Sequence, residues 1–162
     1  WQKLDGAVQK IYGIGPLDAE AIADALSTRS PFPAAKKLAC ALVLPEWVER
    51  FRTRLKKELE GVLGENGHAV QVQMLTEHAH LPWKFIAVSL DTRALPTTPP
   101  ANWIESADDL SVSRITIIDA QRPLIVIGLL DRSRYWTATQ ARLLASDIIW
   151  EHGAMLEERA RR

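Results

Sequence analysis

The segment Glu77-His78-Ala79-His80 holds the closest pair of histidines in the chain. Alternate residues of a strand point to the same side, so His78 and His80 could bind one metal ion, with Glu77 or a water molecule completing the shell. The segment ends at Leu81-Pro82, which also fits a strand end or loop with solvated histidines. His78 and His80 are therefore candidate metal ligands, with an ordinary loop as the alternative.

Three aspartates each follow a predicted strand, namely Asp91, Asp119 and Asp131. Carboxylates at one edge of a sheet can bind a metal or a substrate, which would suit a small metal-dependent enzyme. Aspartate also ends strands and opens turns for local reasons, and we favour that explanation. The sequence has no Gly-rich phosphate loop and no Gly-x-Ser-x-Gly motif, so it favours binding over catalysis.

Two glycines separate two predicted helices in the stretch KIYGIGPLDAEAIADAL, residues 10–26. Pro16 suits the first turn of the second helix, where no backbone N–H is needed. The pattern Ile11-x-Gly13-Ile14-Gly15-x-x-x-Ala19-x-x-Ile22 resembles the helix-hairpin-helix motif of DNA repair and recombination proteins. The resemblance implies that Gly13, Ile14 and Gly15 present N–H groups to a DNA phosphate without reading base sequence.

The charges around this hairpin depart from that motif. DNA-binding members usually carry Lys or Arg just after the turn, whereas this chain has Asp18, Glu20 and Asp24. Carboxylates oppose a phosphate, although they suit the dipole at a helix N-terminus. The basic residues that could offset them are Lys3, Lys10, Arg29, Lys36 and Lys37. Contact with a DNA backbone and simple helix packing both remain open.

Tryptophan is frequent, with six residues in the chain. Trp83, Trp103 and Trp136 fall in or near predicted loops. Exposed together they would form a docking patch for a partner or ligand, and buried they would cover the open face of a small sheet.

The last third of the chain, residues 114–160, resembles the end of a GAF sensor domain. There a strand ending near a glycine leads through Trp136-Thr137 into a long helix. That resemblance implies ligand sensing and pairing of the last helix with a second copy.

The same region also resembles a phospholipase-D-type half domain, with Arg114 and Asp119 at its Lys and Asp positions. Val112 replaces the nucleophilic histidine and Leu129 the serine, so a covalent phospho-enzyme could not form. This resemblance implies an inactive domain that binds a ligand through Arg114 and Asp119.

Composition limits the classes of function. Lys and Arg total 20 and Asp and Glu total 20, so bulk charge would not hold the chain on nucleic acid or on an anionic membrane. Cys40 is the only cysteine, which fits a reducing, cytoplasmic location. The apolar runs are far shorter than the roughly 20 residues of a membrane helix, no signal peptide is evident, and the chain begins at Trp1.

The predicted elements give an α+β fold. Helices are expected over 3–12, 17–27, 34–43, 46–62 and from 138 to about 160, and strands over 69–75, 84–90, 114–118 and 124–130. Residues 1–45 form a helical hairpin module, and residues 46–162 form a mainly antiparallel four-stranded sheet packed on a long C-terminal helix. Strands 114–118 and 124–130 are expected at the centre of the sheet. In helix 17–27, Ala21, Ile22, Ala25 and Leu26 are expected to face inward.

The sequence thus predicts a non-enzymatic binding or regulatory module that needs no cofactor. Its ligand pocket is expected between the sheet and the loop 91–110. Partners would be a protein, or a second copy through the C-terminal helix. The alternatives are a nucleic-acid-binding accessory protein that uses the hairpin, and a small metal-dependent hydrolase.

Overall fold

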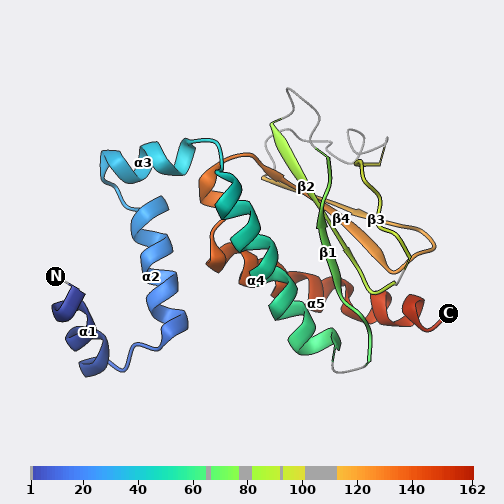
Figure 1. Ribbon diagram of the computed structural model, residues 1–162, viewed down its shortest axis with the longest axis horizontal. Helices are drawn as coiled ribbons and strands as arrows, with labels where there is room; N and C mark the ends of the chain where they lie inside the picture. The colour runs from blue at the N-terminus through green and yellow to red at the C-terminus, as the bar shows by residue number, and fades with distance from the viewer. Residues whose placement is uncertain (1, 65–66, 77–81, 92, 101–112) are drawn as a thin grey trace.

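The computed structural model describes residues 2–64, 67–76, 82–91, 93–100 and 113–162 (Figure 1). Its helices and strands follow the chain in this order: α1 (Gln2–Ile11), α2 (Pro16–Thr28), α3 (Pro33–Cys40), α4 (Pro45–Leu63), β1 (Gln71–Met74), β2 (Trp83–Ser89), β3 (Arg114–Ile118), β4 (Leu124–Leu130), the short 3-10 helix η3 (Ser133–Tyr135) and α5 (Ala138–Ala160). We call residues 2–44 the arm and residues 45–162 the body. In Figure 1 the arm stands to one side of the body.

The strands form one antiparallel sheet in the order β1-β2-β4-β3. β2 and β4 pair over seven residues at its centre, from Trp83 opposite Leu130 to Ser89 opposite Leu124. The expected α+β class is confirmed, with helices first and a long C-terminal helix on the sheet. The expectation that both strands of the last hairpin are central was wrong, because β3 lies at the sheet edge and leaves Thr116 and Ile118 exposed.

α4 and α5 pack side by side and cover one face of the sheet (Figure 1). Every fourth residue of α4 is buried, as helical periodicity requires: Phe51, Leu55, Leu59 and Leu63. They pack against apolar residues of α5 and the central strands, such as Leu144. Each such side chain contributes about 1.5–3 kcal/mol by leaving water. This layer is the main core.

A second apolar cluster lies on the other face of the sheet. It joins Trp83 and Phe85 of β2 with Ile115 of β3, and Leu95 covers it from the chain segment after β2. Gly128 of β4 sits directly opposite Phe85, and a Cβ at residue 128 would approach the Phe85 ring to 2.7 Å. The missing side chain therefore makes room for this ring.

α5 begins as its sequence predicts. Thr137 is the N-cap, and its hydroxyl oxygen accepts a hydrogen bond from the Gln140 N–H at 3.2 Å. No helix in the described part of the chain is long and apolar enough to cross a membrane.

Polar contacts tie the arm to the body where the two meet. The Val43 N–H donates to Oδ1 of Asp131 at 3.1 Å, and Oδ2 of Asp131 lies 3.5 Å from Nζ of Lys84. The Ser133 N–H donates to the Ala41 carbonyl at 2.9 Å. Since Lys84 and Asp131 are largely buried, this junction fixes where the arm leaves the body.

Candidate functional site

The turn between α1 and α2 is a helix C-cap of the Schellman type. The Ile14 N–H donates to the Gln9 carbonyl at 2.8 Å, and the Gly13 N–H to the Lys10 carbonyl at 3.4 Å. Gly13 has a φ of +63°, the left-handed conformation that this cap requires. The first glycine therefore has a local structural role.

The second glycine begins α2. The Gly15 N–H donates to Oδ2 of Asp18 at 3.1 Å, so a carboxylate of the chain itself occupies this donor. With the bonds of Gly13 and Ile14, all three N–H groups expected to hold a phosphate have partners within the chain. A DNA phosphate would have to displace Asp18 from Gly15.

The candidate basic residues do not gather at this hairpin. Lys10 is exposed and lies three residues before Gly13. Arg29 follows the last residue of α2, about 20 Å from the hairpin for a helix of 13 residues. Lys36 and Lys37 are exposed on α3, which follows α2 in the chain. The side chain of Lys3 lies outside the described structure.

α2 turns two of its three carboxylates, Glu20 and Asp24, toward the body. Glu20 accepts from Arg54 at 2.8 Å and from Arg50 at 3.3 Å, both on α4. Asp24 accepts the Thr139 N–H at 2.8 Å, so it binds a free donor in the first turn of α5. Glu20 and Asp24, two of the three acids that oppose DNA binding, therefore fasten the arm to the body, whereas Asp18 bonds Gly15 within the arm.

The apolar residues of α2 face the opposite way. Ile22 is 46% exposed and Leu26 is 63% exposed, and they share a helix face because they are four residues apart. Ala25 is exposed too, so the expectation that this apolar set faces inward was wrong. The reason is that charged and cap-forming groups of the body, Arg50, Arg54 and the Thr139 N–H, take up the polar side of α2.

Further apolar side chains of the arm are exposed. Tyr12 is 76% exposed, Ile11 78% and Phe32 68%. We call Ile11, Tyr12, Ile22, Leu26 and Phe32 the outward set. Sequence reasoning missed it, although one signal was present: α2 carries carboxylates at 20 and 24 on one side and apolar residues at 22 and 26 on another.

Two of the three candidate tryptophans, Trp83 and Trp136, are buried and so do not form an exposed docking patch. Trp83 is 4% exposed and Trp136 is 1% exposed, and they belong to the clusters on opposite faces of the sheet. Trp136 packs on Phe51 with ring centroids 5.1 Å apart, and its Nε1 donates to the Leu130 carbonyl at 2.9 Å. Both are core residues. Trp103 lies outside the described residues.

Arg114 and Asp119 lie at opposite ends of β3 and its turn, so they do not share one site. Burial raises the pKa of Asp119, but the N–H groups of Arg122 and Gln121, which donate to Oδ1 at 2.8 and 2.9 Å, more than compensate, and the pKa lies below its usual value. Asp119 thus holds the β3–β4 turn. A pocket of about 480 Å³ lies beside it, bounded by Pro96 and residues 98–100 on the loop side.

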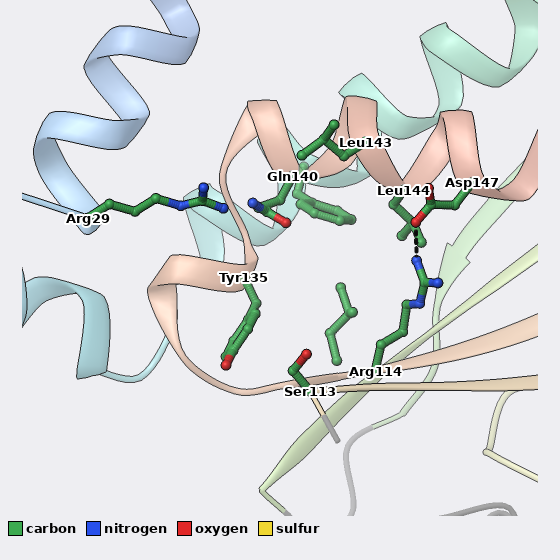
Figure 2. Close-up of a pocket in the computed structure, with 10 residues that line it drawn as sticks. Arg29, Ser113, Arg114, Tyr135, Gln140, Leu143, Leu144 and Asp147 are labelled. Atoms are coloured by element: carbon green, nitrogen blue, oxygen red, sulfur yellow. Dashed lines mark hydrogen bonds and ion pairs between the residues drawn. The ribbon is translucent and has the colours of Figure 1, made fainter. Parts of the chain in front are cut away.

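Arg114 lines a different pocket, of about 490 Å³, between the end of α2, the start of α5 and the sheet (Figure 2). Its guanidinium is ion-paired with Asp147 of α5. Arg29 and Gln140 enter this pocket from the other end. The structure thus brings together Arg29 and Arg114, which the sequence had assigned to two different sites.

The solvent-facing side of helices α4 and α5 also carries exposed apolar residues. Trp150 of α5 is 86% exposed, Leu143 lies two turns earlier at 52%, and Val62 of α4 is 47% exposed. Trp150 and Val62 line one shallow pocket together. The long C-terminal helix therefore exposes two large apolar side chains, Leu143 and Trp150, to solvent.

The histidine pair cannot be placed, because His78 and His80 lie outside the described residues. Within the part of the chain that the structure describes, no group of three or more His, Cys, Asp or Glu residues is arranged to hold a metal ion.

No protein-family model, no curated protein and no solved structure matches this chain. Its function is therefore inferred from its own residues.

Proposed function

We propose that this chain is a non-enzymatic protein-interaction module and that the outward set of the arm binds a partner protein. The observation that supports this proposal is the reversed orientation of α2. The helix pairs Glu20 with Arg50 and Arg54 and bonds Asp24 to the start of α5. It leaves Ile22 and Leu26 exposed to water.

The number of exposed apolar side chains on the arm fits a protein contact. Isolated apolar side chains are common on protein surfaces, but several on one small helical unit are not. A typical partner contributes about 800 Å² to a stable interface, and the centres of such interfaces are rich in Tyr, Phe and aliphatic side chains. Tyr12 and Phe32 have the residue types and the exposure of such anchors.

A protein partner fits the arm better than a nucleic acid does. The N–H groups of the hairpin are bonded within the chain, and Asp18 stands where a phosphate would bind. The chain has no net charge, and three of the candidate bases lie at or beyond the far end of α2. Backbone binding of DNA needs free donors and positive charge at one place.

Site-specific photo-crosslinking in an extract of the native host tests the proposal. The full chain carries p-benzoylphenylalanine at Leu26 or at Phe32, or at Gln73, an exposed residue of β1 that serves as the control. We expect one discrete crosslinked protein from both arm positions and none from Gln73. The same product is expected to disappear when Ile22→Lys is added, since a buried lysine would disrupt the contact.

Two results would contradict this function. One is the absence of any discrete crosslink that depends on the arm. The other is salt-dependent binding of short duplex or branched DNA that Gly13→Ala/Gly15→Ala abolishes, because this would make the hairpin a nucleic-acid contact.

A second copy of the chain is a further candidate partner, favoured by the exposed Leu143 and Trp150 of α5. A tryptophan that is 86% exposed is well suited to anchor such a contact. Sedimentation equilibrium of the wild type and of Trp150→Ala tests this. Dimers that the substitution weakens at least tenfold would support it, and a monomeric wild type would exclude it.

A further inference from the structure

The pocket of about 490 Å³ next to Arg114 lies where the arm meets the body. Arg29 comes from the C-terminal end of α2, Gln140 from the first turn of α5 and Arg114 from the start of β3 (Figure 2). Its volume is in the range of about 300–1,000 Å³ that small-molecule sites usually occupy.

The polar groups at the arm end of this pocket lack partners. Arg29 and Gln140 point toward one another across the pocket (Figure 2). Among the residues that the structure describes, neither side chain makes a hydrogen bond or ion pair. Both present N–H donors, and an arginine is always charged. Arg29 is exposed to water, and an acceptor placed between the two side chains could bind both.

The charge around the pocket is positive. It is lined by the guanidiniums of Arg29 and Arg114 and by one carboxylate, Asp147, which is already paired with Arg114. The acids on the inner side of α2 do not add free negative charge here, because Glu20 pairs with arginines of α4 and Asp24 caps α5.

The rest of the lining is mixed, with Ser113 among several apolar side chains. Phe51 and Leu129 belong to the main core, and Leu144 reaches the pocket from α5. The Tyr135 ring forms part of the wall. Apolar side chains beside a few convergent polar groups are a common design of a site for a small organic molecule.

We propose that this pocket binds a small organic anion that has an apolar ring or chain and one carboxylate or phosphate group. The oxyanion accepts from Arg29 and Gln140, the positive charge of Arg114 supports it, and the apolar part packs against the accessible side chains of Tyr135 and Leu143. Since Arg29 belongs to the arm and Gln140 to the body, the ligand joins the two. This site is independent of the partner contact proposed for the outward set.

Isothermal titration calorimetry of the full chain with three probes tests the site. Phenyl phosphate and benzoate each combine a ring with an oxyanion, and benzyl alcohol is the neutral control. We expect saturable binding of at least one anion and roughly tenfold weaker binding of the alcohol, because a charge-assisted hydrogen bond is lost. Tighter binding of phenyl phosphate identifies a phosphate ligand, and tighter binding of benzoate a carboxylate.

Variants assign the binding to this pocket. Arg29→Gln removes the charge at the arm end, Gln140→Met removes the amide at similar size, and each is expected to weaken the better anion roughly tenfold. Arg161→Gln, an exposed site at the end of α5, is the control with the same charge change and should leave binding unchanged. Absence of anion binding, equal binding of benzyl alcohol, or equal losses in Arg29→Gln and Arg161→Gln would overturn the proposal.

Discussion

Helix α2 of the arm and the core of the body bury opposite kinds of side chain. The body packs Phe51, Leu55 and Ile148 between its helices and its sheet. The arm directs Glu20 and Asp24 inward and leaves Leu26 in water. Nine of the thirteen large apolar side chains exposed in the described residues belong to the arm, which is about a quarter of the chain.

This difference shows that an amphipathic helix can be held by its polar face. Two ion pairs of Glu20 and one cap by Asp24 orient α2. Each contributes only about 0.5–2 kcal/mol. The apolar face, with Ile22 46% and Leu26 63% exposed, then contributes little to the stability of the isolated chain. We infer that its contribution comes when the partner binds.

The same substitution in the two regions gives the sharpest test. Leu55→Ala removes a side chain with no exposed surface and is expected to lower the free energy of unfolding by about 2–5 kcal/mol. Leu26→Ala should change it by less than about 0.5 kcal/mol, because Leu26 is 63% exposed. Urea unfolding monitored by circular dichroism measures both. A loss above about 1 kcal/mol for Leu26→Ala would mean that the arm packs this residue.

Two glycine substitutions compare the cost of a steric clash with the cost of a left-handed backbone conformation. Gly128→Ala places a methyl group against the Phe85 ring in the body, and we expect a loss of about 1–3 kcal/mol as the ring is displaced. Gly13→Ala meets no atom within 4 Å, and its cost of about 1 kcal/mol comes from the φ of +63° alone. In a chain that carries Phe85→Leu, Gly128→Ala should lower the free energy of unfolding by less than it does in the wild type, because the ring that the methyl group meets is gone. The same background should leave the loss in Gly13→Ala unchanged.

The body was largely predictable from its sequence, and the orientation of the arm was not. The spacing of Phe51, Leu55 and Leu59 predicts a buried helix face, and the apolar run 124–130 predicts a central strand. For α2 the same reasoning identified which residues share a face but chose the wrong face for the interior. That choice depends on Arg50 and Arg54, which lie some thirty residues further along the chain.

The candidate sites divide in the same way. The left-handed Gly13 and the N-cap at Thr137 follow from local sequence patterns. A turn and a helix start could therefore be predicted at these positions. The pocket that Arg29, Arg114 and Gln140 share could not be predicted, because these residues come from three distant segments. Single-sequence patterns do not report which distant segments meet.

Removing an anchor should release the arm without unfolding the body. Asp24→Ala takes away the acceptor of the Thr139 N–H, at a cost of about 1 kcal/mol, and loosens α2. We expect faster amide exchange throughout α2 and unchanged exchange in β2 and β4. Asp18→Ala is the control, since this exposed carboxylate bonds only within its own helix turn. Equal effects of the two substitutions on exchange in α2 would argue against an anchoring role for Asp24.

The smallest expected effect concerns acid sensitivity, and it belongs to the body. The N–H of Arg93, which donates to Oδ1 of Asp91 at 2.9 Å, and the guanidiniums of Arg93 and Arg122 lower the pKa of Asp91, although burial opposes them. Because the folded pKa lies below the unfolded value of about 3.9, this contribution is present above that pH and is lost as the pH falls through the folded pKa. Asp91→Asn should therefore reduce the stability lost between pH 6 and pH 3 in urea unfolding. An unchanged loss would assign the acid sensitivity to other carboxylates, Asp119 first, whose pKa is also lowered.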